Sequence, residues 1–162
     1  QFNFRGKNMG LFLSTITNRM DKKGRVSVPA SFRSALSTKD FNGVICYPSP
    51  GVNSITGCSY ERIKQISEAI DAQGGPFDQL RDDFSTAILS DSHQLSFDSE
   101  GRIHIPDELL KHSLIKDYAT FVGQGSTFQI WDPNKFEKYK SKARATASQQ
   151  RNKLKWGNIN QT

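Results

Sequence analysis

Residues 20–29, with the sequence Met-Asp-Lys-Lys-Gly-Arg-Val-Ser-Val-Pro, recur at residues 97–106 as Phe-Asp-Ser-Glu-Gly-Arg-Ile-His-Ile-Pro. Both stretches read apolar–Asp–x–x–Gly–Arg–β-branched–x–β-branched–Pro, and the second follows the first at a constant offset of 77 residues. The similarity continues on the C-terminal side, where Phe32 corresponds to Leu109 at the same offset. The chain therefore contains two copies of one unit.

Each copy predicts a β-hairpin followed by a short helix. An Asp that begins a turn and a Gly three residues later suit a type I turn closed by a left-handed residue, a conformation that glycine adopts without strain. The β-branched residues that follow alternate with polar ones, as in a half-buried strand, and the proline suits the first turn of a helix. Because the copies share this pattern, the residues assigned to turn structure are Asp21, Gly24, Asp98, Gly101 and Arg102.

The repeat also predicts how the chain is divided. Amphipathic helices are expected over residues 60–72 and 77–90, the segment 49–57 reads as a polar loop, and beyond Arg144 the apolar pattern fades, so that fraying is expected there. The expected segments are an N-terminal extension (1–13), a first repeat (14–73), a connecting helix (74–90), a second repeat (91–145) and a basic flexible tail (146–162).

The small size of each copy predicts how the copies are arranged. A unit of about 60 residues buries limited surface by itself. We therefore expect the two copies to pack on each other about a pseudo-two-fold axis. The fold class that the residues indicate is mainly β with flanking helices (α+β).

The two copies share their geometry but carry opposite charge. Residues 18–33 contain five basic residues against Asp21 alone, a net charge of +4, whereas residues 95–110 contain four acidic residues against Arg102, a net charge of −3. Turn geometry does not require the extra cations of the first copy. Basic side chains on a two-stranded hairpin suit phosphate contacts and, for arginine, bidentate recognition of guanine. The predicted DNA-binding residues are Arg19, Lys22, Lys23, Arg25 and Arg33.

The composition argues against several other classes of protein. No run approaches the ~20 apolar residues of a membrane span, and no N-terminal stretch has the pattern of a secretory signal, so we expect a cytoplasmic protein. Cys46 and Cys58 form no Cys-x-x-Cys pair, and the three histidines lack metal-ligand spacing. No catalytic triad, carboxylate pair or phosphate loop is recognisable. We therefore expect neither an enzyme nor a metal, a cofactor or a small-molecule substrate.

The doubled Asp-x-x-Gly-Arg motif, with a strand and a proline after each copy, strongly resembles the MraZ family over residues 10–145. Its units are similar to the AbrB-type swapped-hairpin fold, so the resemblance implies a duplicated, double-split β-barrel. It also implies a bacterial transcriptional regulator, usually a repressor, of the division and cell-wall gene cluster. Further implications are binding to short direct repeats in promoter DNA upstream of its own gene, a ring-shaped homo-oligomer at the nucleoid, and a DNA contact by Arg25, assisted by Arg19, Lys22 and Lys23.

Two functions remain open from the sequence. The first is a sequence-specific DNA-binding regulator. The second is a non-enzymatic interaction or assembly module, such as an antitoxin-like partner or a ring scaffold, because duplicated β units with apolar faces can form rings without nucleic acid. Binding through several phosphates gives affinity a steep dependence on salt, whereas a flat dependence would favour the second function.

Overall fold

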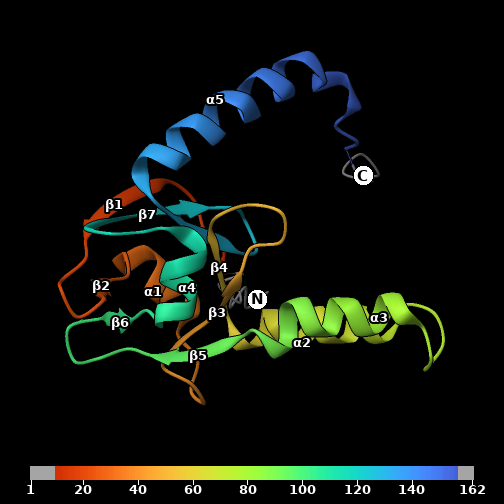
Figure 1. Ribbon diagram of the computed structural model, residues 1–162, viewed down its shortest axis with the longest axis horizontal. Coiled ribbons are helices and arrows are strands. Elements are labelled where there is room, and N and C mark those ends of the chain that lie inside the picture. Colours follow the sequence, from red (N-terminus) through yellow and green to blue (C-terminus); the bar gives the residue numbers. More distant parts are fainter. Residues whose placement is uncertain (1–9, 157–162) are drawn as a thin grey trace, which may run out of the picture.

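The computed structural model describes residues 10–156 and has the expected α+β class (Figure 1). The first repeat contains β1 (Thr15–Arg19), β2 (Arg25–Ser27), α1 (Ala30–Leu36), β3 (Gly43–Pro48), β4 (Ile55–Cys58) and α2 (Tyr60–Asp71). The connection contains α3 (Gln79–Phe84) and a π-helical stretch (Ser85–Ser90). The second repeat contains β5 (His93–Ser96), β6 (Arg102–His104), α4 (Asp107–Ser113), β7 (Tyr118–Gly123), β8 (Phe128–Trp131) and α5 (Pro133–Gln149), followed by a 3₁₀ turn (Arg151–Lys153).

Six strands form one sheet in the order β1-β7-β8-β4-β3-β5, and β2 pairs with β6 in a separate two-stranded ladder. All of these pairs are antiparallel. The strand pairing shows no closed barrel among the described residues, because β1 and β5 are the two open edges of the sheet. The strands that follow the two turns, β2 and β6, have three residues each and lie outside this sheet. They pair with each other and do not close its edges.

Strands of the two repeats are interleaved in the sheet. β1 of the first repeat pairs with β7 of the second, with Thr17 opposite Thr120, and β5 of the second repeat pairs with β3 of the first, with Ile45 opposite Gln94. The strand order reads the same when the repeats are exchanged, because β1, β3 and β4 correspond to β5, β7 and β8. Each edge strand therefore depends on the other repeat for its partner.

The β2–β6 ladder fastens the two hairpins to each other. Beyond its three residue pairs, the N–H of Val28 donates to the Gly101 carbonyl at 3.1 Å, and the N–H of Ile105 donates to the Gly24 carbonyl at 2.9 Å. Each turn is thus hydrogen-bonded to the strand end of the other hairpin. This arrangement fixes the position of the two turns relative to each other.

The main core lies between one face of the sheet and a layer made of α1, α4 and the ladder. Aromatic rings occupy its centre, where the Phe32 centroid is 5.4 Å from that of Phe12 and 5.1 Å from that of Phe128. Burial of an apolar side chain of this size contributes about 1.5–3 kcal/mol. The other large, fully buried side chains of this core are Val26, Val28, Leu36, Ile55, Ile103, Ile105, Leu109, Phe121 and Ile130.

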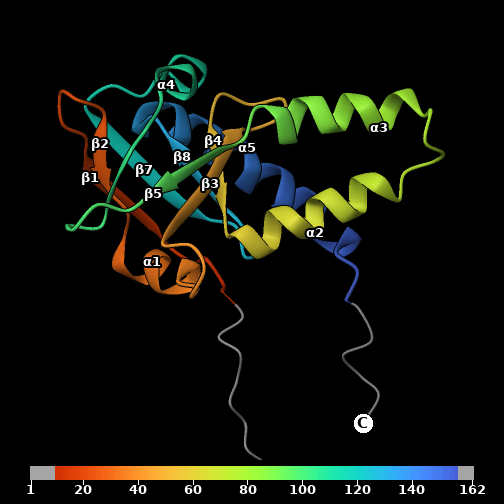
Figure 2. The ribbon, with the colours of Figure 1, turned by 90° about the horizontal axis from the view of Figure 1, so that it is seen from below.

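Two helices cover the opposite face of the sheet. α2 packs on it through Ile63, against Tyr47 of β3, and α5 packs through Phe136, whose ring centroid is 6.0 Å from that of Trp131. α2 and α3 then project from the body as a two-helix arm (Figures 1 and 2). The residues of α5 from Ser141 onward are exposed.

The structure contains one strand that the sequence pattern does not predict. The segment 49–57, expected to be a loop, forms a turn and then β4, which lies between β3 and β8. Its buried hydroxyls bond to each other, with Ser49 Oγ 2.7 Å from Thr56 Oγ1 and 2.7 Å from Ser54 Oγ. Polar composition does not indicate exposure here, because these groups satisfy one another.

The ends of the described chain differ from expectation. Phe12, which falls in the expected extension, is buried in the main core, and its N–H and carbonyl pair with Gly125 at 2.8 and 3.0 Å. The fraying expected beyond Arg144 is wrong, because α5 continues to Gln149. The remaining parts of the expected extension and tail, residues 1–9 and 157–162, lie outside the described residues.

The connecting helix is also less regular than its apolar spacing suggests. It begins only at Gln79, and its backbone changes to a π-helix at Ser85. Phe77, the first residue of the expected amphipathic helix 77–90, lies before the helix and is 97% exposed, so the helix does not bury it as the expectation requires. Ile88, further along, packs against the β3 side of the sheet.

Gly57 in β4 provides a test of this packing. A Cβ at this position would overlap the ring of Phe128, so Gly57→Ala is expected to lower the free energy of unfolding by about 1–3 kcal/mol through overpacking. Gly75→Ala is the matched control, because a Cβ there meets no atom within 4 Å. Its effect is expected to stay below about 0.5 kcal/mol. Urea unfolding measures both, and equal stabilities would contradict the packing described for β4.

Candidate nucleic-acid interface

The first turn is built around the carboxylate of Asp21. Its Oδ1 accepts hydrogen bonds from the backbone N–H groups of Lys23 at 3.0 Å and Arg25 at 2.8 Å, and its Oδ2 accepts one from Arg25 Nε at 2.7 Å. Gly24 closes the turn with a φ of +80°, and its N–H donates to the Asp21 carbonyl at 3.1 Å. One aspartate thus holds both the backbone of the turn and the arginine that follows it.

The second turn repeats these contacts with one difference. Asp98 accepts hydrogen bonds from the N–H of Glu100 at 2.9 Å, the N–H of Arg102 at 3.0 Å and Arg102 Nε at 2.8 Å. Arg102 Nη1 also pairs with the Glu100 carboxylate at 3.1 Å. Lys23 takes the place of Glu100 in the first turn, and among the described residues Arg25 forms its ion pair through Nε alone. Among the described residues, Arg25 therefore keeps both of its Nη groups without a partner, whereas Nη1 of Arg102 is paired.

The turn contacts lower the pKa of both aspartates. For Asp21 the largest cause is the hydrogen bond from the N–H of Arg25, while desolvation, the next largest cause, acts in the opposite direction. The pKa of Asp98 is lowered in the same way by Arg102, and the hydrogen bond to Asp98 raises the pKa of Arg102. Both aspartates are therefore charged at neutral pH, and each turn holds its arginine as an ion pair.

The β2–β6 ladder brings side chains from both hairpins to one face. Arg25 lies directly opposite His104, and Ser27 lies opposite Arg102, while the central pair of the ladder is buried. The side chains of Arg25 and Arg102 are 37% and 28% exposed, and His104 is exposed. Strand alternation therefore produces a small polar surface to which both repeats contribute.

Three of the predicted DNA-binding residues lie together at the first turn. Lys22 and Lys23 form its exposed tip, and Arg25 follows on the ladder. Arg19 is also exposed but lies at the end of β1, opposite Tyr118 in the main sheet.

The fifth predicted residue, Arg33, lies at the other turn. Its Nη1 donates to the carbonyl of Val28. Its guanidinium is so close to Gly101 that a Cβ there would come within 2.8 Å of Arg33 Cζ. These contacts belong to a residue that supports the second turn, and the structure does not bring Arg33 together with the lysines of the first.

The proximity of His104 to the first turn is not predicted from the sequence. Alternation with its isoleucine neighbours places His104 on the exposed face of its strand. Only the register between β2 and β6 brings it opposite Arg25, and this register joins segments far apart in the chain.

Both turns lie at the same end of the molecule, opposite the arm of α2 and α3 (Figures 1 and 2). Residues 60–91, which include this arm, contain seven acidic and three basic residues, in contrast to the basic stretch 18–33. The charges of the first turn therefore favour a polyanion there over the arm, although the second hairpin at the same end is acidic.

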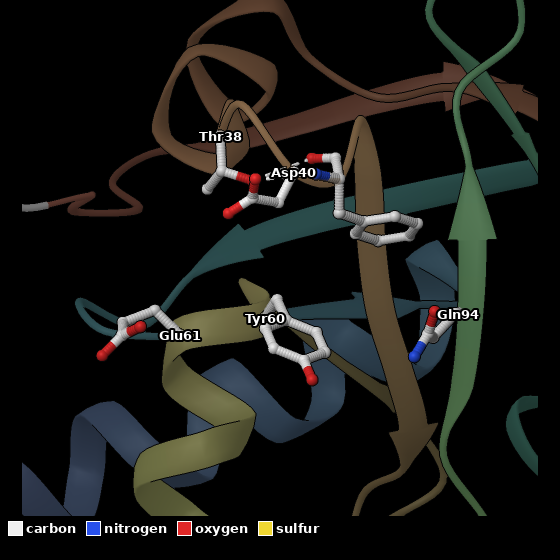
Figure 3. Close-up of a pocket in the computed structure, with 6 residues that line it drawn as sticks. Thr38, Asp40, Tyr60, Glu61 and Gln94 are labelled. Carbon is white, nitrogen blue, oxygen red and sulfur yellow. Dashed lines mark hydrogen bonds between the residues drawn. The ribbon is translucent and has the colours of Figure 1, made fainter.

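A separate hollow of about 420 Å³ lies between the α1–β3 loop, the start of α2 and β5 (Figure 3). Asp40 and Glu61 bring two carboxylates to it, beside Tyr60 and Gln94. These carboxylates disfavour a phosphate-bearing ligand. Within residues 10–156, no three His, Cys, Asp or Glu side chains are grouped to hold a metal, and no helix is long and apolar enough to cross a membrane.

Comparison with known proteins identifies close relatives. A family model described as "MraZ protein, putative antitoxin-like" matches residues 88–155. The chain is 58% identical over 146 residues to "Transcriptional regulator MraZ" of Pelagibacter ubique (strain HTCC1062), covering 90% of this chain and 94% of that protein. Proteins of the same name from Rickettsia akari (strain Hartford) and Rickettsia peacockii (strain Rustic) are 44% and 45% identical, covering 93% and 88% of this chain and 100% and 95% of theirs.

The pH dependence of stability tests the role of Asp21. Because folding lowers its pKa, the carboxylate stabilises the fold above the ordinary aspartate pKa of about 3.9, and this contribution is lost as the pH falls through the lowered value. Asp21→Asn is therefore expected to be less stable than the parent near neutral pH, with a smaller difference at about pH 2. Urea unfolding at both pH values measures this. Asp98→Asn should show the same pH dependence. A stability difference between Asp21→Asn and the parent that is equal at both pH values would contradict the stabilising role of the Asp21 carboxylate.

Proposed function

The chain belongs to the MraZ family, and we propose that it is a transcriptional regulator that binds double-stranded promoter DNA through its first hairpin turn. The observation that carries this proposal is the difference in charge between two turns with the same contacts. Lys22 and Lys23 take the positions that Ser99 and Glu100 occupy in the second turn. Because the second turn forms without them, the lysines are free to contact phosphates.

Arg25 supplies the sequence-specific contact. Asp21 holds its Nε and so orients the guanidinium, while its two Nη groups have no partner among the described residues. Two N–H donors of this kind fit O6 and N7 of guanine in the major groove, and that groove admits a two-stranded β-ribbon such as the ladder. Arg25 then reads a base while the lysines bind the backbone.

Assembly and target follow from the family resemblance. The interleaved repeats form a swapped-hairpin fold of the AbrB type. The chain assembles into a ring-shaped homo-oligomer, in which neighbouring subunits each contact one of several short direct repeats. These repeats lie upstream of its own gene in the division and cell-wall gene cluster, where binding represses transcription. The protein acts at the nucleoid in the cytoplasm and has no catalytic role.

Arg25→Ala is expected to weaken binding to a duplex from this promoter by about 5- to 150-fold, because it removes the contact to the base. The loss should be much smaller for a duplex of scrambled sequence. The same substitution breaks the pair with Asp21, so Arg102→Ala is needed as a stability reference that breaks the equivalent pair with Asp98. Gel-shift titration and thermal unfolding are the two measurements. Parent-like promoter affinity of Arg25→Ala would remove the proposed site.

The lysines are tested by the dependence of affinity on salt. The double variant Lys22→Gln/Lys23→Gln is expected to weaken promoter and scrambled duplexes alike, and to reduce the slope of log affinity against log salt by about 2. Lys64→Gln, on the arm at the opposite end, is the control and should leave the slope unchanged. A flat slope for the parent protein would favour the assembly module instead.

A further inference from the structure

The exposed face of the β2–β6 ladder includes a side chain, His104, that has no role in the fold or in the DNA contacts proposed above. His104 is exposed, and within the described part of the chain its ring forms no hydrogen bond or ion pair. His112 differs, because its Nε2 lies 2.9 Å from the Val52 carbonyl. Burial therefore does not explain His104, and neither does a structural hydrogen bond.

The ring of His104 lies against the backbone of the first turn. A Cβ built on Gly24 would come 3.4 Å from His104 Cδ2 and 3.6 Å from its Nε2. The ring therefore lies within van der Waals reach of the position that a Gly24 side chain would take, next to the first turn. The ring is held beside Arg25 in the ladder.

Resting on the proposed function, we infer that His104 is a second DNA-contact residue, which the second hairpin contributes to the interface of the first. Directly opposed side chains in an antiparallel pair have Cβ atoms about 5 Å apart, and stacked base pairs are about 3.4 Å apart. His104 and Arg25 therefore reach the same or neighbouring base pairs when the ladder enters the groove. A neutral imidazole offers one donor and one acceptor for DNA.

The antiparallel register explains how an acidic hairpin can contribute such a contact. It places His104, at the end of β6, beside the cationic first turn and away from the carboxylates of its own turn. Arg102 lies on the same face but at the other end of the ladder, where Asp98 and Glu100 neutralise it. His104 is thus the side chain through which the second hairpin approaches DNA with little repulsion.

The test compares His104→Ala with His104→Gln in the full chain, on the promoter duplex and on a scrambled duplex. The alanine variant is expected to bind the promoter duplex about 3- to 10-fold more weakly, from loss of one hydrogen bond. The glutamine variant keeps a donor and an acceptor and should recover most of this loss. His93→Ala is the matched control, because His93 lies in the same repeat and faces Glu108 at 3.5 Å, away from the ladder. Thermal unfolding shows whether either variant affects the fold.

The outcomes separate this inference from the function on which it rests. Parent-like affinity of His104→Ala, together with weakened binding by Arg25→Ala, would overturn the inference alone. Parent-like affinity of Arg25→Ala and of the lysine variant would overturn the proposed function. A lower unfolding temperature for His104→Ala, without recovery of affinity in His104→Gln, would assign His104 to turn structure and also overturn the inference.

Discussion

The structure depends on the reciprocal hydrogen bonds by which each hairpin turn holds the strand end of the other. The N–H of Val28 reaches the Gly101 carbonyl, and the N–H of Ile105 reaches the Gly24 carbonyl. One such bond contributes only about 0.5–1.5 kcal/mol net. Together with the three-residue ladder, however, the two bonds fix both hairpins and hence the edge strands β1 and β5, each of which pairs within the other repeat. A binding surface that must keep a defined geometry needs turns held in this way.

The same frame supports two turns of opposite chemical character. An aspartate organises each backbone and holds an arginine, so the remaining turn positions are free to vary without changing the fold. In the second turn, the Glu100 carboxylate forms a second ion pair with the guanidinium of Arg102. In the first, Lys23 stands at that position and Arg25 keeps its terminal donors. Two changes of residue type, Lys22 for Ser99 and Lys23 for Glu100, thus distinguish a cationic turn from an acidic one on the same frame.

Features determined by neighbouring residues could be predicted from the sequence, and features determined by distant pairing could not. The turns, the strands that follow them and the helices after each proline rest on local chemistry, such as the positive φ of Gly24. The central strand β4 could not be predicted, because its hydroxyl-bearing residues indicate a loop. In the structure these hydroxyl groups are buried and hydrogen-bond to one another. The position of Arg33 beneath the second turn and that of His104 beside the first depend on the crossing of the hairpins, which no local pattern encodes. The predicted group of cations is therefore divided in space.

The order of the strands in the sheet is unchanged when the two repeats are exchanged, and this symmetry has an evolutionary consequence. Two separate copies of a single-repeat ancestor could supply each other with edge partners, so this sheet is one that an ancestral homodimer could have formed. In such a dimer both loops would carry one sequence, and any cation gained would appear twice. Gene fusion removes this restriction, because each half then mutates independently. One half could then gain cations while both kept the shared turn geometry.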